Sequence, residues 1–241
     1  MTVNSKRASK GGSRRGLIAT LAAVAFVVSG VSLIGVSIAS QQGAPEPPVT
    51  NGFGTALASA VESSALHALS QAPSTNVTGP ILSRSKPVTL DIPAIEVHSA
   101  VQDLGQDADG GLEAPAPGPH YNEAAWYRHS PTPGSLGPAI MLGHVDSAVD
   151  GPSVFFRLGE LRPGDRLSVT RADDSIAVFI VDEVARYAKD NFPTKLVYGD
   201  INFAGLRIVT CGGAFDDTTG HYLDNIVVFA SLVDSPGISA E

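Results

Sequence analysis

The stretch Leu206-Arg-Ile-Val-Thr-Cys-Gly-Gly213 places a short apolar strand directly before a cysteine and two glycines. Similar short runs rich in apolar and β-branched residues, separated by Gly and Pro, continue outward from it in both directions. The predicted strands cover residues 88–92, 95–101, 138–142, 166–170, 176–187, 206–210 and 225–233. Residues 153–161 and 192–198 favour short helices or turns. Many short strands with little helix predict a mainly β protein, with a closed or nearly closed β-barrel of about 155 residues.

An uninterrupted apolar segment, residues 17–39, precedes this domain. As a helix it would span roughly 35 Å, which is enough to cross a bilayer. Five basic residues and no acidic residue come before it, which predicts a cytoplasmic basic tail over residues 1–16 and an extracellular remainder. We therefore expect a single-pass transmembrane signal anchor at residues 17–39. A cleaved signal peptide stays open because small residues surround Ala39, although the segment exceeds the usual apolar length of about 7–15 residues.

Composition divides the rest of the chain. Residues 40–80 are rich in Pro, Gly, Ser and Ala and predict a disordered linker, followed by a folded domain at residues 81–235 and a C-terminal tail at residues 236–241. The other 11 of the 16 Lys and Arg residues share this part of the chain with all 24 Asp and Glu residues. Such an acidic domain repels phosphate backbones, so we expect no nucleic-acid partner.

Cys211 is the one cysteine of the chain. An exported domain with one Cys forms no internal disulfide, and an exposed thiol outside the cell is a liability unless it is used. A lone Cys is often a small buried hydrophobic residue. Here, however, it precedes Gly212 and Gly213, which permit backbone angles that other residues avoid and leave nearby amides free to face a ligand. The position favours a nucleophile.

His144 occupies a matching position shortly after the apolar run 138–142. An imidazole can take the proton of a thiol and later protonate a leaving amine. The pair Cys211 and His144 alone is weak evidence. The role of His221, close after the cysteine, stays open. We expect surface or capping roles for the remaining histidines, His67, His98, His120 and His129.

Three motifs, in this order along the chain, make the sequence similar to a known family. They are Gly143-His-Val-Asp-Ser147, Ile208-Val-Thr-Cys-Gly-Gly213 and Gly220-His-Tyr-Leu-Asp-Asn-Ile-Val-Val-Phe-Ala230. Together they resemble the sortases, specifically the class F sortases of high-GC Gram-positive bacteria. The resemblance covers about Lys86 to Val233.

The resemblance implies an eight-stranded sortase β-barrel with short helices. The apolar segment and its basic flank independently predict a location at the cell membrane with the catalytic domain extracellular. The resemblance also implies a cysteine transpeptidase that cleaves sorting signals of secreted proteins, commonly Leu-Pro-x-Thr-Gly (LPXTG), between Thr and Gly. Cys211 would form the thioacyl enzyme, His144 would serve as acid and base, and Thr210 would line the substrate groove. A peptidoglycan amine would then accept the protein.

The sequence departs from the family at one position. Sortases commonly carry an Arg on the strand after the cysteine, where this chain has Asn225, and no Arg follows Arg207. An Asn amide can donate hydrogen bonds to a carbonyl oxygen or an oxyanion without supplying charge. Asn225 is therefore a candidate catalytic residue, with a strand cap as the alternative. Arg207, Arg186 and Arg128 are possible replacements from other elements.

The missing Arg leaves other functions open. One is a barrel that has lost catalysis and only binds sorting-signal peptides, and another is a different exported cysteine acyltransferase or hydrolase, such as an L,D-transpeptidase. Asp146 could orient the imidazole of His144, but its position before Ser147 favours a turn. No residues have the spacing of metal ligands, so we expect neither a metal nor a cofactor.

Overall fold

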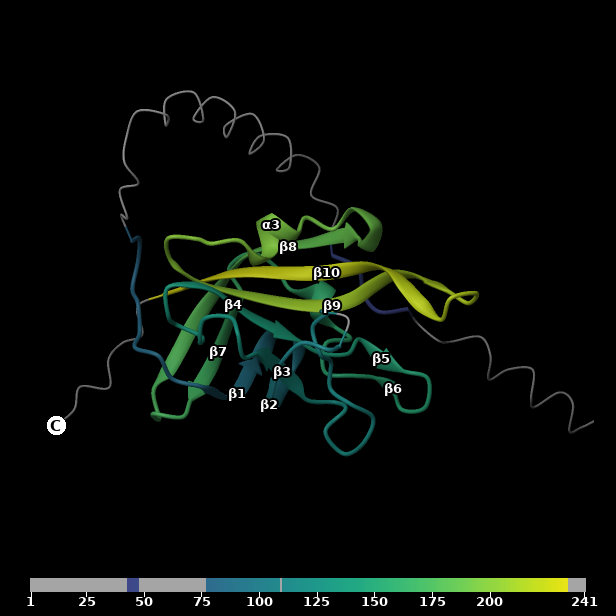
Figure 1. Ribbon diagram of the computed structural model, residues 1–241, viewed down its shortest axis with the longest axis horizontal. Coiled ribbons are helices and arrows are strands. Elements are labelled where there is room, and N and C mark those ends of the chain that lie inside the picture. Colours follow the sequence, from purple (N-terminus) through teal and green to yellow (C-terminus); the bar gives the residue numbers. More distant parts are fainter. Residues whose placement is uncertain (1–42, 48–76, 109, 234–241) are drawn as a thin grey trace, which may run out of the picture. The chain divides into compact units, whose positions relative to one another are not determined.

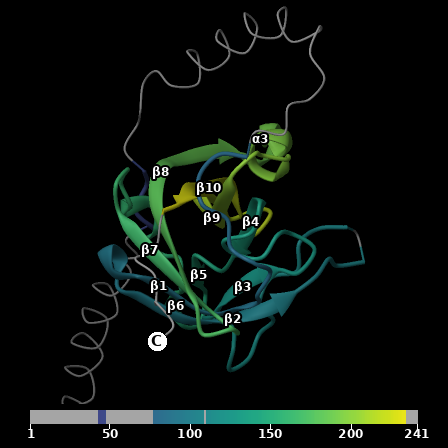
Figure 2. The same cartoon turned by 90° about the vertical axis from the view of Figure 1, so that its left-hand side faces the viewer.

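The computed structural model describes residues 43–47, 77–108 and 110–233. Within them, eight strands form a closed barrel in the order β1-β2-β3-β4-β9-β10-β8-β7 (Figures 1 and 2). The strands are β1 (Pro87–Ile92), β2 (Val97–Leu104), β3 (Ala124–Tyr127), β4 (Gly137–Leu142), β7 (Arg166–Arg171), β8 (Ile176–Ala188), β9 (Ala204–Asp216) and β10 (His221–Leu232). The predicted mainly β barrel is confirmed.

The other described elements are short. A two-stranded sheet is formed by β5 (Asp146–Ser147) and β6 (Gly151–Pro152). Three 3-10 turns and one α-helix complete the described part: η2 (Pro93–Ile95), η3 (Leu158–Glu160), η4 (Lys189–Asn191) and α3 (Thr194–Tyr198). The last two lie in the connection from β8 to β9, so this connection carries helical structure beside the strand that holds Cys211.

Two ladders of the barrel are parallel, β2 with β3 and β4 with β9. The other strand pairs of the barrel are antiparallel, including the long hairpin of β9 and β10. Parallel strands end at the same edge of a sheet. The chain that follows β4 and the end of the β4 ladder on β9 therefore lie at one edge of the barrel.

Alternation along β9 separates two apolar clusters. Leu206 and Ile208 belong to the barrel interior, where they pack with Met141, Phe179 and Val228. The intervening residues face outward, because successive side chains of a strand point to opposite faces. On that outer face Val209, Val227 and Phe229 pack with Val197 of α3 in a second cluster. Burial on both faces explains why β9 reads as a continuous apolar run rather than an alternating one.

The structure corrects several boundaries. β9 does not end at Cys211 but continues to Asp216, and β10 begins at His221 rather than at residue 225. The glycines after Cys211 lie inside this hairpin, where a Cβ on Gly212 would come within 2.8 Å of Ile226. Gly213 has φ +75°, at the shift of register near Tyr222, which only a residue without Cβ adopts freely.

Other differences concern short elements. β3 was not predicted, since its sequence Ala-Ala-Trp-Tyr has no β-branched residue. The helix expected over residues 153–161 is reduced to η3, and the one expected over residues 192–198 is α3. Within the described ranges no helix has the length and apolar character to cross a membrane. The predicted segments 1–16, 17–39 and 236–241 lie outside the described residues, as does most of the linker 40–80.

Candidate active site

Cys211 lies half-buried on the outer face of β9. It pairs with Asn225 of β10, and Asn225 pairs with Tyr187 of β8. Side chains at paired positions share one face of a sheet, so these three residues lie in a row across β9, β10 and β8. The second apolar cluster continues this face toward the start of β9. Cys211 is therefore next to a buried apolar cluster and is itself partly reached by solvent.

His144 follows β4 at the same edge of the barrel. The parallel ladder pairs Leu142 with Val209, two residues before His144 and Cys211 respectively. The two chains remain in contact beyond this pair, because the Thr210 hydroxyl donates to the Gly143 carbonyl oxygen at 2.9 Å. The neighbour of the cysteine is thus bonded to the neighbour of the histidine, and the predicted pair is brought to one place on the barrel.

The His144 ring is held on two sides. Tyr121 stacks on it with 4.0 Å between ring centroids and 5° between planes. Its Nε2 lies 2.8 Å from the carbonyl oxygen of Pro115, and a carbonyl oxygen only accepts, so Nε2 carries a hydrogen. In the neutral ring Nδ1 is then the nitrogen available to take a proton.

Two tyrosines and Asp146 lie beside His144 and Cys211. The Tyr222 hydroxyl donates to the Asp146 carboxylate, and the Tyr121 hydroxyl donates to the Asp146 carbonyl oxygen at 3.0 Å. Burial raises the pKa of Tyr121 above its usual value, and the negative charges of Asp146, Asp150 and Cys211 add to the effect. Burial, the hydrogen bond to Asp146 and the negative charge of Cys211 raise the pKa of Tyr222 in the same direction. Both phenols therefore stay neutral beside Cys211.

A lysine contacts the sulfur. Lys189, the first residue of η4, places its Nζ 3.6 Å from Cys211 Sγ. Neither Lys189 nor the two tyrosines were predicted from the sequence. Lys189 lies 22 residues before Cys211 and Tyr121 lies 23 residues before His144, so no local pattern marks them. Tyr222 is within the motif that begins at Gly220, which is the one signal that pointed toward it.

The three arginines proposed as replacements have other partners. Arg207 is 4% exposed, its guanidinium lies 4.7 Å from the Phe229 ring centroid, and burial lowers its pKa to about 10. Arg186 pairs with Ile226, one position from Asn225, and so lies on the opposite face from Cys211; it contacts Glu46 and Asp224. Arg128 binds Asp103 beside Glu113. None of the three contacts the sulfur.

Asn225, Asp146 and His221 have distinct positions. Asn225 lies directly across from Cys211, and its role as an oxyanion donor stays a prediction. Asp146 begins the small sheet, and Ser147 Oγ accepts from the backbone N–H groups of Val149 and Asp150, in agreement with the turn favoured from the sequence.

His221 is exposed and pairs with Asp216 at the far end of the hairpin, away from Asn225. Among the described residues no group of His, Cys, Asp or Glu side chains is arranged to hold a metal ion.

Thr210 is 3% exposed, with its hydroxyl bonded to Gly143. The predicted contact of Thr210 with substrate stays a prediction. The contact that the structure shows, the hydrogen bond to Gly143, is a structural one. Replacing Thr210 by Val keeps the shape and removes the hydroxyl, so we expect the free energy of unfolding to fall by about 0.5–1.5 kcal/mol, because the partly buried Gly143 carbonyl loses its donor. Chemical denaturation measures this change. Thr210→Ser keeps the hydroxyl and is the control; a Val variant as stable as the wild type would contradict the role of the bond.

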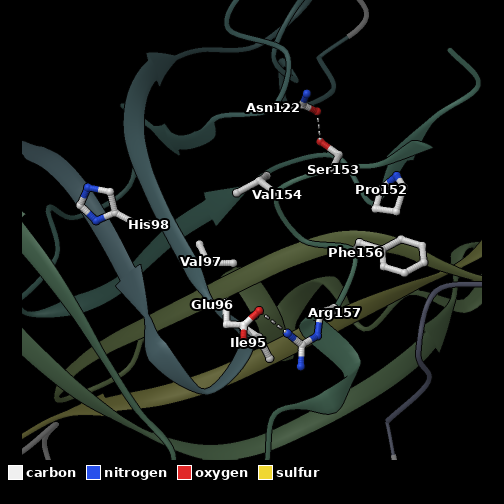
Figure 3. A pocket seen from close by; sticks show the side chains of 10 residues that line it. All are labelled: Ile95, Glu96, Val97, His98, Asn122, Pro152, Ser153, Val154, Phe156 and Arg157. Carbon is white, nitrogen blue, oxygen red and sulfur yellow. Dashed lines mark hydrogen bonds and ion pairs between the residues drawn. The ribbon is translucent and has the colours of Figure 1, made fainter. Parts of the chain in front are cut away.

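A pocket lies elsewhere on the same domain (Figure 3). It is bounded by the start of β2 and the segment 152–157, with Glu96 paired to Arg157 at 3.2 Å and Ser153 bonded to Asn122 on its walls. Neither Cys211 nor His144 lines it. The chemistry of the candidate site is therefore on the open outer face of β9 and not in this pocket.

Comparison with known proteins gives one family. A family model described as "Sortase domain" matches residues 90–233, more than half of the chain. Solved structures similar to the chain include a sortase D5 transpeptidase of Clostridium perfringens (18% identity, 62% of this chain and 79% of that chain, TM-score 0.44). The chain is also similar to sortase A of Corynebacterium diphtheriae, with 17% identity, 65% of each chain covered and a TM-score of 0.47. It is similar as well to a pilus-related sortase C of Group B Streptococcus, with 14% identity, 76% of this chain and 89% of that chain covered, and a TM-score of 0.46. No curated protein sequence matches the chain.

Proposed function

The chain belongs to the sortase family of cysteine transpeptidases, and we propose that it is a class F-like, membrane-anchored enzyme that joins secreted proteins to a cell-wall amine. The observation that supports this most directly is the junction of Cys211 and His144. Their chain neighbours are hydrogen-bonded to one another at the end of the parallel β4–β9 ladder. The proposed substrates are sorting signals of the Leu-Pro-x-Thr-Gly kind, and residues 17–39 are the proposed anchor.

Acylation begins with the transfer of the thiol proton to the imidazole. The resulting thiolate of Cys211 attacks the Thr carbonyl carbon of the signal, and the carbonyl oxygen becomes an oxyanion. The C–N bond then breaks, and the imidazolium of His144 gives its proton to the departing amine. The stacked ring of Tyr121 and the bond to Pro115 hold the imidazole in one orientation through these steps.

Transfer reverses the order with a different amine. The amine of a peptidoglycan cross-bridge or stem peptide attacks the thioester carbon, and the imidazole takes the proton that this nitrogen loses. The C–S bond breaks and the thiolate of Cys211 is restored.

Asn225 is the proposed neutral donor to the oxyanion, since it lies across the strand pair from Cys211. Removing one donor of this kind typically lowers kcat by about 10²–10³. We therefore expect Asn225→Ala to lose turnover in that range, with Asn225→Gln, which keeps the amide on a longer side chain, losing less. Steady-state kinetics with a fluorogenic peptide measure both. Unchanged turnover in Asn225→Ala would remove the residue from the mechanism.

The function itself is tested on the full chain in detergent. A fluorogenic peptide containing Leu-Pro-x-Thr-Gly is incubated with and without a peptidoglycan stem peptide as the amine, and products are identified by mass spectrometry. We expect cleavage between Thr and Gly and, with the amine present, a product joined through the Thr carbonyl. Peptide binding without acylation would instead support a barrel that only recognises signals. Recovery of the chain in the membrane fraction after alkaline washing tests the anchor.

A further inference from the structure

The family's Arg is replaced by Asn225, yet the site has a positive charge. Lys189 is an exposed residue whose Nζ lies 3.6 Å from Cys211 Sγ. It starts η4 directly after β8, while Cys211 is on β9, and β10 lies between these two strands (Figure 1). Because neighbouring strands are about 4.8 Å apart, the lysine side chain must extend over β10 to reach the sulfur. This arrangement follows from the order of strands in the barrel.

We propose that Lys189 is the catalytic cation of this enzyme, pairing with the Cys211 thiolate and then with the oxyanion that forms on the attacked carbonyl; the second part rests on the proposed function. The reacting carbon must come within about 3–3.5 Å of the sulfur before attack. A carbonyl oxygen on that carbon is then within reach of an ammonium group, which has three donors on a flexible stem. Asn225 supplies a neutral donor beside it, and Lys189 supplies the charge.

The charges around the sulfur support this assignment. Ionisable groups near the sulfur include His144, the acidic Asp146 and Asp150, and the two phenols Tyr121 and Tyr222, whose raised pKa values keep them neutral. Asp146 repels a thiolate, and the phenols do not neutralise it. A cation at 3.6 Å offsets that repulsion when the imidazole has given up its proton.

The three arginines cannot take the role in the observed fold. Arg207 is buried under Phe229. Arg186 is on the other face of the sheet, and Arg128 is bound to Asp103. Lys195, in the same β8–β9 connection, is exposed on α3 and has no contact with the sulfur. It is therefore a matched control for a lysine substitution in this connection.

The first test uses alkylation and needs no peptide substrate. Because the chain has one cysteine, the rates with iodoacetate, an anion, and iodoacetamide, which is neutral, report on Cys211 alone. A cation beside the sulfur favours the anionic reagent. We expect the ratio of the two rates to fall about fivefold in Lys189→Met, to persist in Lys189→Arg, and to be unchanged in Lys195→Met. Both sites are exposed, so thermal unfolding should match the wild type. An unchanged ratio in Lys189→Met would overturn the proposal.

The second test uses transfer to the amine. Lys189→Met is expected to lower kcat about 10²-fold with little change in KM, and Lys189→Arg is expected to restore most of it. If the Lys189 side chain had a purely structural role, restoring only the positive charge with Arg would not restore kcat. If the wild type turns over no peptide but the alkylation ratio still depends on Lys189, the proposed function fails and the cation at the sulfur stands.

A different role for the amine is also distinguishable. An unprotonated Lys189 could attack the thioester itself and leave an amide on the enzyme. Hydroxylamine cleaves a thioester and not an amide, so intact mass after peptide and hydroxylamine separates the two. A hydroxylamine-resistant adduct that disappears in Lys189→Met would show a nucleophile and overturn the assignment as a cation. We expect only the hydroxylamine-sensitive adduct.

Discussion

Cys211→Ala is expected to abolish the thioacyl adduct and all transfer to an amine. The sulfur is the atom that forms the bond to the substrate, and the chain contains no second thiol to replace it. Loss of the nucleophile in enzymes that use one typically removes the covalent pathway entirely. Intact-mass spectrometry of the protein after incubation with a signal peptide measures the adduct, and product analysis with an amine measures transfer.

The control for this variant is its stability. Cys211 is only half-buried on the outer face of β9, so Ala removes little buried surface and we expect the midpoint of thermal unfolding to change by no more than a few degrees. Peptide binding should also survive, since the change removes only the sulfur atom from the site. An adduct of unchanged yield in Cys211→Ala would refute the assigned nucleophile.

His144→Ala is expected to lower kcat/KM for transfer by about 10²–10⁴-fold, the usual contribution of a general acid and base. The loss has two sources, because the ring both moves the proton and is the stacking partner of Tyr121. Steady-state kinetics measure the change. Adding imidazole to the buffer should recover part of the rate if the missing function is proton transfer.

Two further variants separate chemistry from structure. His144→Gln keeps an N–H group that can donate to Pro115 and lacks a base of suitable strength, so it should lose about as much activity as the Ala variant. His221→Ala removes the histidine whose role stayed open, at the exposed end of the hairpin, and should retain wild-type turnover. Full activity in His144→Gln, or a large loss in His221→Ala, would reassign the base.

Residue types and local pattern were enough to predict many of the barrel strands. β1, β4 and β8 agree closely with the predicted runs, since each is an apolar or β-branched segment bounded by Gly, Pro or charged residues. β3 was not predicted because it is only four residues long and has no β-branched side chain. The extension of β9 through Gly212 and Gly213 was also missed. Glycine normally marks the end of a strand, whereas here it accommodates Ile226 and the shift of register on the facing strand.

The candidate nucleophile and base came from the sequence because the chain has one thiol, one histidine follows a strand in a matching position, and the ordered motifs around both resemble those of the sortases. Their catalytic roles stay predictions, as does that of Asn225. The structure adds the physical junction, a hydrogen bond between Thr210 and Gly143, and the stacking of Tyr121 on the imidazole. These contacts join segments far apart in the chain.

From the amino-acid order alone follow the β class, the bounds of β1, β4 and β8 to within one residue, and the candidate pair Cys211 and His144. Which cation lies at the sulfur was decided by barrel closure. The order β8-β10-β9 carries Lys189 over the middle strand to Cys211, while the alternation of the same strands turns Arg186 to the opposite face and buries Arg207 under Phe229. Contacts across non-adjacent strands depend on register and closure, and neither is encoded in any local stretch of the chain.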